Sequence, residues 1–513
     1  MLTDIAELDG RERHADIAVI GTGIAGAELG TYLAARGHDV ILLESGREDF
    51  DPAIQKLNDI DFIGKPHRAL DPNAGYHPYL PPELRGVSRV RQLGGTSNVW
   101  TGKWKHLQRT DFGGRPWVPD SDWPFGLDEL LPHYREAARD YGFGDLEAEA
   151  ERSGVKALRD ALRGEVKATS FYWEATPTRT RIRFGEVMRR SARLQVITGA
   201  TATRIDTTPD GTAVAGVSCR SLDGHVLTVR ARIVVLATGA IEAPRLLLAS
   251  SSEAHPAGLG NAAGLVGRYY ADHPKHHTSD LDPGPLTRAY ADELQYAPKP
   301  RFCLCFALDD DTQRKERLLE HVLYLKPIYE TRRDRLGRWL RRRPACRDGL
   351  GAVRSYRVKL VTEQVPNPDS RVTLSDALDP LGVPVARLDW RFTPDDHRSL
   401  ARVTTLLAER FERLGVGSLR LKDDPPTLDA MTDAAHQMGT TRMGRTPAEG
   451  VVNADGQVFG VDGLFVAGSA TFPTCPSYSP TFTILALARR LGRHLDDSLA
   501  ARGRQPVAEG ASA

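Results

Sequence analysis

A glycine-rich turn near the start of the chain constrains the fold more than any other feature. The apolar run Ile17–Ile20 is typical of a buried parallel strand, and Gly21, Gly23 and Gly26 follow it as G-x-G-x-x-G. Glycines at this spacing let the backbone turn tightly and approach a pyrophosphate, whose charge the N-terminus of a following helix attracts. The pattern predicts a dinucleotide-binding β-α-β unit.

The residues after the turn complete this unit. A helical stretch runs through Leu29 and Leu33 and stops at Gly37, and the apolar run Val40–Leu43 ends at Glu44. A carboxylate at that position accepts hydrogen bonds from an adenosine ribose and repels a 2′-phosphate. The sequence therefore predicts that Glu44 and the three glycines bind FAD or NAD, and this stretch leaves both cofactors open.

Length, charge and cysteine content narrow the class of protein. A chain of 513 residues exceeds one ordinary core, so we expect two domains or one domain wrapped by insertions. The net charge of +1 gives no argument for a nucleic-acid partner. The five cysteines are odd in number and lack metal-ligand spacing, which argues against a disulfide framework and against a metal site.

The ends of the chain and its apolar runs bear on location. The first residues carry acidic side chains where a signal peptide is basic, and no apolar run reaches the roughly 20 residues that span a bilayer. We therefore expect a cytoplasmic protein without a membrane span, and flexible tails at residues 1–13 and 501–513.

Two later segments favour FAD over NAD. Residues 200–231 alternate and turn at 209–211 and 223–224, which predicts a three-stranded meander of the kind that interrupts the parallel sheet in FAD-binding folds. Near the C-terminus, a strand at Leu464–Ala467 leads to a long apolar helix that begins near Pro480. The N-terminus of a helix stabilises the anionic edge of a reduced flavin.

Seven motifs in a fixed order then give the chain a family resemblance. It resembles the glucose–methanol–choline family of FAD oxidoreductases, and within it the sugar-type branch with pyranose oxidases and fructose or gluconate dehydrogenases. The matching motifs, which span almost the whole chain, are GTGIAGAELG at 21–30, LGGTSNVWTG at 93–102, TGAIEAPRLLL at 238–248, VGRYYADHP at 266–274, SRVTL at 370–374, HQMGTTRMG at 436–444 and GLFVAGSATFP with SPTFTILALA at 463–488.

The resemblance implies an α/β fold with an α+β second domain. We expect a Rossmann-like FAD-binding domain with an inserted β-meander, and a substrate-binding domain built on a broad antiparallel sheet. The FAD-binding domain is expected to be discontinuous, at 14–115, 190–275 and 431–500, with the substrate-binding domain at 116–189 and 276–430.

The resemblance also implies a chemistry for His436. The family oxidises an alcohol by removing the hydroxyl proton and passing the hydride of the carbon to flavin N5. The histidine of H-x-x-G-T-x-R-M-G resembles the base in that scheme, and His436 occupies its position. An imidazole suits this task because it takes a proton near neutral pH and is reset by solvent.

Ser479 departs from the family pattern. Relatives usually carry asparagine or histidine where the last helix starts, often as N-P-T, but this chain reads Ser479–Pro480–Thr481. A serine hydroxyl hydrogen-bonds a substrate oxygen, but it is no base at neutral pH without activation. Ser479 therefore either assists His436 in catalysis or caps the helix, or does both, and Tyr478 is the nearest side chain that would fill the gap.

Further cofactor contacts follow from the resemblance. The LGGTSNVWTG loop would run along the isoalloxazine ring, and its glycines permit close approach. Val99 stands where some relatives tether FAD through a histidine, so we predict a non-covalent flavin. Beyond the first unit, the residues expected to bind FAD are Gly95, Thr96, Ser97, Asn98, Ala202, Gly468, Ser469 and Thr481.

Two features of the predicted substrate-binding domain allow several interpretations. Glu363 and Gln364 lie late in a predicted strand. Either one of them faces the substrate, or both belong to a structural strand end. Residues 332–344 carry seven arginines, which suit an acidic partner, a phosphate or a membrane surface. For Glu363 and Gln364 we favour the structural strand end. For residues 332–344 we favour a solvated, mobile excursion between strands.

The sequence thus predicts an FAD-dependent alcohol oxidoreductase that acts on a CH–OH group of a small polyhydroxylated substrate, such as a sugar or glycoside. Oxygen, a quinone or another carrier would reoxidise the flavin, and the oligomeric state is not predicted. A non-redox lyase of the same fold and an inactive FAD-binding scaffold are the alternatives.

Overall fold

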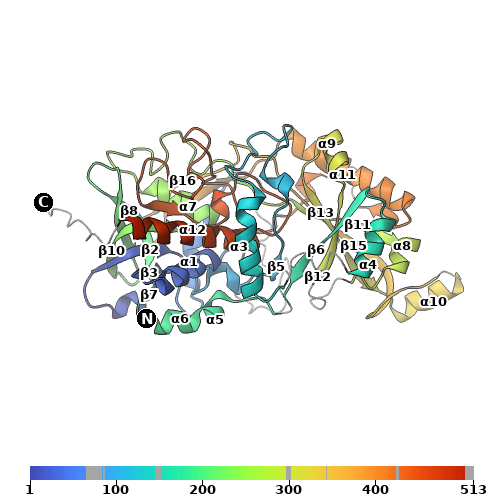
Figure 1. The fold of residues 1–513 in the computed structure, drawn as a ribbon, viewed down its shortest axis with the longest axis horizontal. Helices are drawn as coiled ribbons and strands as arrows, with labels where there is room; N and C mark the ends of the chain where they lie inside the picture. The colour runs from blue at the N-terminus through green and yellow to red at the C-terminus, as the bar shows by residue number, and fades with distance from the viewer. Residues whose placement is uncertain are drawn as a thin grey trace.

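Two large sheets, one toward each end of an elongated molecule, dominate the structure (Figure 1). The structure is a computed structural model, and it describes residues 1–64, 84, 87–144, 152–174, 176–295, 302–341, 344–422 and 427–502. Among these residues, no helix combines the length and the apolar character needed to cross a bilayer.

The first sheet has eight strands in the order β1-β7-β3-β2-β10-β9-β8, with β19 also paired to β10. Strands β1, β7, β3, β2, β10 and β19 run parallel, whereas β8, β9 and β10 form an antiparallel meander, as predicted. Their bounds are β1 Leu2–Asp4, β2 Glu12–Ile20, β3 Val40–Leu43, β7 Leu194–Thr198, β8 Thr201–Thr207, β9 Val214–Arg220, β10 Val226–Leu236 and β19 Leu464–Val466.

The N-terminal residues differ from the expected flexible tail. Strand β1 pairs in parallel with β7, with Leu2 opposite Val196 and Asp4 opposite Thr198. Residues 1–13 therefore contribute an edge strand to the sheet, because the backbone hydrogen bonds of β7 would otherwise be open on that side. Of the expected C-terminal tail, residues 503–513 lie outside the described ranges.

Side chains of the parallel strands are buried on both faces. Ile17 and Val19 of β2 pack with helices α1 (Ile24–Ala35) and α12 (Thr481–Arg502), whereas Ala18 and Ile20 join a core on the opposite face. Helix α7 (Gly239–Ala249) contributes to that second core. This arrangement explains why the strand reads as a continuous apolar run rather than an alternating one.

The second sheet also has eight strands and is antiparallel throughout, in the order β18-β11-β15-β13-β12-β6-β5, with β14 beside β15. It confirms the predicted broad antiparallel sheet. Its strands are β5 Lys103–Trp104, β6 Val166–Trp173, β11 Lys275–Pro283, β12 Phe302–Leu308, β13 His321–Tyr329, β14 Cys346–Asp348, β15 Gly351–Thr362 and β18 Gly417–Leu421.

Helix α11 (Pro394–Arg413) covers one face of this second sheet. Phe411 of the helix packs against Phe306 of β12, and Thr393 and Asp396 form a capping box at the helix start. Because side chains alternate along a strand, residues such as Tyr324 and Val361 project to the opposite face. That opposite face is the one that contributes to the cavity described below.

A third, three-stranded sheet and helix α3 join parts that the sequence placed in different domains. Strands β16 (Arg371–Leu378), β17 (Pro384–Asp389) and β4 (Ile60–Phe62) pack against α7. Helix α3 (Leu127–Asp140) packs against α12, where the hydroxyls of Tyr134 and Thr483 lie 2.6 Å apart. The division of the chain at the expected boundaries therefore stays a prediction.

The arginine-rich segment contains a helix. Helix α10 (Arg332–Leu340) begins at a capping box formed by Thr331 and Asp334, so this part is regular rather than an irregular excursion. It projects from the end of the molecule that holds the second sheet (Figure 1). The remaining helices are α2 Pro52–Gln55, α4 Ser153–Ala161, α5 Thr180–Arg183, α6 Gly185–Arg190, α8 Pro285–Ala289 and α9 Asp310–Glu316.

Candidate active site

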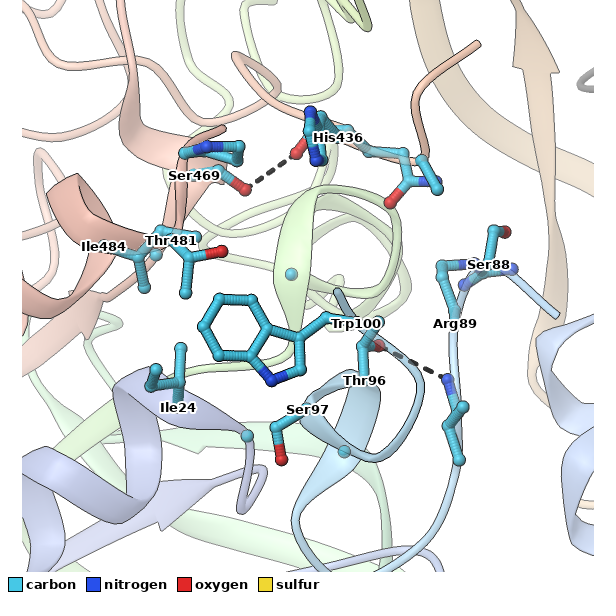
Figure 2. A pocket seen from close by; sticks show the side chains of 18 of the residues that line it. Ile24, Ser88, Arg89, Thr96, Ser97, Trp100, His436, Ser469, Thr481 and Ile484 are labelled. Carbon is cyan, nitrogen blue, oxygen red and sulfur yellow. Dashed lines mark hydrogen bonds between the residues drawn. The ribbon is translucent and has the colours of Figure 1, made fainter. Parts of the chain in front are cut away.

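A cavity of about 910 Å³ is lined by residues of both large sheets. Gly21 and Gly23 of the glycine turn contribute to one part of its wall, and Tyr324 and Lys359 of the second sheet contribute to another. In Figure 2, His436 and Ser469 lie across the cavity from Ser97. The cavity therefore brings together the segment predicted to bind a dinucleotide and the histidine predicted to act as a base.

The glycine turn and Glu44 form the nucleotide end of the cavity. Gly21 has a positive φ of 100°, and a Cβ on Gly23 would meet no protein atom within 4 Å. The Glu44 carboxylate accepts hydrogen bonds from the backbone N of Thr22 at 3.1 Å, from its hydroxyl at 2.5 Å and from Gly46 N at 2.9 Å. Burial raises the pKa of Glu44 in spite of these bonds.

Gly26 serves packing rather than contact with the cavity. It is absent from the cavity wall, and a Cβ on it would lie 2.0 Å from the carbonyl oxygen of Gly21. Only a glycine lets the first turn of α1 approach the strand–helix turn this closely. Gly26 therefore shapes the turn, and its predicted part in the cofactor site stays a prediction.

The loop at 93–102 lines the cavity through three of its four predicted residues. Gly95, Thr96 and Ser97 lie on the wall, and the Ser97 hydroxyl donates to Gly94 O at 2.7 Å. Asn98 does not reach the wall, because its side-chain amide turns back and donates to Leu93 O at 3.0 Å. The Asn98 amide nitrogen thus holds the loop, and the predicted contact of Asn98 with the cofactor stays a prediction.

The other predicted cofactor residues all lie on the cavity wall. The Ser469 hydroxyl donates to the carbonyl oxygen of Gln437 at 2.7 Å, the upper dashed bond in Figure 2. This bond ties the segment after β19 to the residue that follows His436. The set consists of Ala202, Gly468, Ser469 and Thr481, and Val99, at the position where some relatives tether FAD, also lines the cavity.

His436 is held in place through its backbone and its ring. Its backbone N donates to the Asp272 carboxylate at 3.0 and 3.1 Å. Its Nδ1 lies 3.0 Å from Nδ1 of His273, so one of the two rings donates a proton to the other. The Asp272 carboxylate also accepts from the backbone N of His273 at 2.7 Å and of Ala434 at 3.0 Å.

His273 and Asp272 are functional residues that the sequence analysis did not single out. They lie in the motif VGRYYADHP, which helped to identify the family, but 163 residues separate His273 from His436. The available signal for a functional role was the adjacent aspartate and histidine in this motif. Sequence spacing alone gave no reason to join them to His436.

Both imidazoles are kept uncharged. Burial lowers the pKa of His436 well below its usual value, and His273, Lys275, Lys359 and Lys103 lower it further through their positive or partial charges. Burial lowers the pKa of His273 to about 3, although the nearby Pro476 carbonyl opposes that shift. At neutral pH the pair therefore holds no net charge, and His436 is able to accept a proton.

Ser479 lies on the cavity wall with His436, but Tyr478 does not. The Tyr478 hydroxyl donates to the buried Glu320 carboxylate at 3.3 Å, and the Lys105 ammonium lies 4.8 Å from the centre of its ring. The neighbouring tyrosine therefore does not fill the place of the asparagine or histidine found in relatives. Ser479 is the side chain that occupies that part of the wall.

Glu363 and Gln364 belong to the structural strand end that we favoured. Arg115 makes two hydrogen bonds to the Glu363 carboxylate, at 2.5 and 2.8 Å. Gln364 accepts from the Trp390 indole at 2.8 Å and donates to Arg391 O at 2.8 Å. Neither side chain lines the cavity.

The cavity wall has the character expected of a cofactor site. Three of its polar atoms, Thr238 Oγ1, Gln437 Nε2 and Ser477 Oγ, are buried without a hydrogen-bond partner in the described part of the chain. Buried polar groups are normally paired, so these atoms point to a polar ligand. Together with the open space at Gly23 and the Glu44 carboxylate, they fit a dinucleotide such as FAD.

The chain is similar to known oxidoreductases along most of its length. Family models described as GMC oxidoreductase match residues 150–275 and 366–488. Paromamine 6'-oxidase from Streptomyces fradiae is 27% identical over 96% of this chain and 93% of that protein. The fructose dehydrogenase large subunit from Gluconobacter japonicus is 22% identical over 93% of this chain and 96% of that protein.

The fold is similar to that of a solved structure. The crystal structure of pyridoxine 4-oxidase from Mesorbium loti matches with a TM-score of 0.60 over 93% of this chain and 98% of that chain, at 19% sequence identity. At this identity the match supports the arrangement of the two large sheets and not a shared substrate.

Proposed function

The chain belongs to the GMC oxidoreductase family, and from that premise we propose that it oxidises a CH–OH group of a sugar, glycoside or related polyol with FAD as cofactor. The observation that carries the proposal is the joining of His436 to the glycine-turn cofactor site within a single cavity. The names of the relatives support the substrate class, because they act on paromamine and on fructose.

The FAD site is built from the glycine turn, Glu44, the loop around Thr96 and Ser97, and the start of α12. FAD supplies the acceptor for the hydride that leaves the alcohol carbon. Gly23 would leave room for the pyrophosphate, and Glu44 would accept a hydrogen bond from the adenosine ribose. We propose a non-covalent flavin, since Val99 has no side-chain nucleophile to form a bond.

His436 acts as the base in this proposal. If its Nδ1–H donates to Nδ1 of His273, its Nε2 is left as a proton acceptor. The Asp272 carboxylate fixes the backbone of both histidines, so the acceptor nitrogen keeps its direction.

Ser479 orients the substrate. It lies on the same wall as His436, and its hydroxyl is able to donate to or accept from a substrate oxygen. A serine does not act as a second base at neutral pH, so the proton of the alcohol goes to His436 alone. His436 would thus take the hydroxyl proton, and bound FAD would supply the acceptor for the hydride.

Product analysis tests the proposed function. The purified protein, loaded with FAD, is incubated with sugars, glycosides and simple polyols, with oxygen or a quinone as acceptor. We expect one equivalent of carbonyl product for each two electrons passed to the acceptor, with one of the two acceptors preferred. Carbonyl release without reduction of an acceptor would indicate a lyase, and no turnover of any alcohol would contradict the proposal.

A further inference from the structure

The second sheet presents five basic side chains to the cavity. They come from four strands that are distant in sequence, and all five lie on the cavity wall: Lys103 of β5, Lys275 of β11, Lys326 of β13, and Arg357 and Lys359 of β15. Lysine and arginine gathered on one wall of a cleft raise the local concentration of anions. We call these five residues the cationic wall.

The register of the strands fixes the arrangement of the cationic wall. Lys326 lies directly opposite Arg357 in the β13–β15 ladder, and Tyr324 lies opposite Lys359. Because side chains two residues apart share a face, Arg357 and Lys359 both project toward the cavity. Lys326 and Arg357 are exposed, and neither forms an ion pair with another described residue within 4 Å.

Lys103 is held in a fixed position on this wall. Its ammonium lies 5.1 Å from the ring centre of Phe171, 4.9 Å from that of Trp173 and 5.1 Å from that of Tyr324. Such contacts favour the charged form of the amine, although burial lowers the pKa of Lys103 to about 8. Lys103 therefore remains mostly protonated at neutral pH.

The acidic side chains that line the cavity have partners other than Lys326 and Arg357. Among the described residues that line the cavity, the two carboxylates are Glu44 and Glu242. Glu44 accepts from Thr22 in the glycine turn, and Glu242 is paired with Arg89 at 2.9 Å and with Arg91 at 2.7 Å. Behind the wall, burial lowers the pKa of Lys275 well below its usual value, and the nearby Asp433 carboxylate opposes that shift.

We propose that the substrate of this site is an anionic polyol, whose carboxylate or phosphate ester binds to Lys326, Arg357 and Lys359 while its hydroxyl faces His436. This inference rests on the proposed function and names the class of its substrate. An arginine beside two lysines suits both anions, because guanidinium and ammonium groups donate charge-assisted hydrogen bonds to either. Substrates that carry an ammonium group would be repelled by the same wall.

An anionic substrate would also counteract the effect of the nearby lysines on the basicity of His436. Lys275, Lys359 and Lys103 lower the pKa of His436 and make it a weaker base. An anion bound among these cations would offset their charge and restore basicity to His436. A neutral substrate gives no such compensation, so the anionic group would assist both binding and proton removal.

A binding experiment tests the wall without requiring turnover. Inorganic phosphate and succinate are titrated into the FAD-loaded protein, and the visible spectrum of the flavin and the heat of binding are recorded. We expect saturable binding of at least one anion to the wild type, weakened on the order of tenfold or more in the double variant Lys326→Met/Arg357→Met. The matched control is Lys315→Met/Arg354→Met, which removes an exposed cation from α9 and one from β15 that does not line the cavity.

A second arm compares substrates that differ only in charge. Glucose, gluconate, glucose 6-phosphate and glucosamine are added anaerobically, and bleaching of the flavin is followed. We expect gluconate or glucose 6-phosphate to act faster than glucose and glucosamine to act slowest. The preference for the anion should fall in the Lys326→Met/Arg357→Met variant and persist in the control, while the carboxylate and phosphate probes separate the two anion types.

The outcomes separate this inference from the proposed function. Equal rates of bleaching by the neutral and the anionic compounds would support the proposed function and overturn the inference of an anionic substrate. Should none of these four compounds bleach the flavin, the binding arm decides: absent binding, or binding unchanged by the double variant, overturns the inference. A protein that no alcohol reduces, yet binds phosphate through the wall, would contradict the proposed function and the substrate assignment, and would keep only the anion site.

Discussion

At the nucleotide end of the cavity, charged side chains face one another, whereas on the cationic wall they face the cavity. Glu242 is paired with Arg89, Arg91 and Arg245, and Arg245 is also paired with Asp379, so each of these side chains already has a partner of opposite charge. On the wall, Lys326 lies beside another cation, Arg357, and no carboxylate of the described chain pairs with either. The first region is built to hold its own shape, and the second is built to attract a ligand charge.

The two regions also differ in how the sequence encodes them. The glycine turn and Glu44 lie within 24 residues, counting from Gly21 to Glu44, so their geometry follows from one β-α-β unit. The cationic wall draws on four strands between residues 103 and 359. Which residue of each strand faces the cavity depends on register, and a shift of one residue would turn every side chain to the other face.

The largest effect is expected at His436. We predict that His436→Gln lowers kcat by about 10³-fold, since a positioned general base contributes roughly that factor, while FAD stays bound. Steady-state kinetics and the visible spectrum check both parts. The control is His225→Gln, an exposed histidine in the turn between β9 and β10; a loss below about tenfold at His436 would remove it as the base.

A pair of glycine variants tests whether shape and ligand contact are separate at the nucleotide end. Gly26→Ala places a Cβ 2.0 Å from Gly21 O, so we predict that it destabilises the protein even without FAD, by about 1–3 kcal/mol or more. Gly23→Ala meets no protein atom, so we predict an unchanged unfolding temperature without FAD but at least about tenfold weaker FAD binding. Thermal unfolding with and without FAD distinguishes the two, and identical behaviour would refute the distinction.

His273 is predicted to act as a positioning residue. We expect His273→Asn to lower kcat by about 10–100-fold with a smaller change in KM, because the ring of His436 loses its partner at 3.0 Å. His273 also lowers the pKa of His436, so its removal should move the acid limb of kcat/KM to higher pH. A variant that loses activity without that movement would point to a purely structural role.

The acid side of the pH profile is expected to be flat over a wide range. The base is active when uncharged, and its pKa is lowered by burial, by His273 and by Lys275, Lys359 and Lys103. We therefore predict that kcat/KM holds as pH falls through 6.5, the usual pKa of histidine, and declines only well below it. A decline of kcat/KM centred near pH 6.5 would show that the pKa of His436 is not lowered by its surroundings.

The alkaline side should show the smallest effect, and only with an anionic substrate. Lys103 has its pKa lowered to about 8 by burial, so it loses its charge as pH rises through that value. We predict that KM for an anionic polyol rises severalfold above that pH, whereas KM for a neutral polyol changes less. Equal changes of KM for the two substrates would show that the charge of Lys103 does not contribute to binding the anion.

Much of the fold was predictable from the sequence, because its signals are local. The β2–α1–β3 unit, the meander and α12 each follow from periodicity and turn residues close in the chain. The packing roles of Gly26 and Asn98 were not predictable in the same way, since each depends on the direction of one side chain or Cβ in the folded turn. A motif places a residue near a ligand but does not say that it touches one.

The site itself was predictable only in part, for a related reason. His436 followed from its motif, but its partner His273 lies 163 residues earlier and meets it only through the tertiary fold. The edge strand β1 was missed because three residues carry no periodicity from which to infer a strand. Long-range pairing thus accounts for what the sequence did not reveal.

The most direct test of the account is the rate at which an alcohol bleaches the bound flavin in the absence of oxygen. The wild type and His436→Gln, each loaded with FAD and matched for flavin content, are mixed with the best polyol substrate in a stopped-flow spectrometer. We predict rapid and complete bleaching in the wild type, and bleaching slowed by about 10³-fold in the variant. Equal rates in the two proteins, or no bleaching in the wild type with any alcohol, would contradict the central claim that His436 and FAD act together on an alcohol in this cavity.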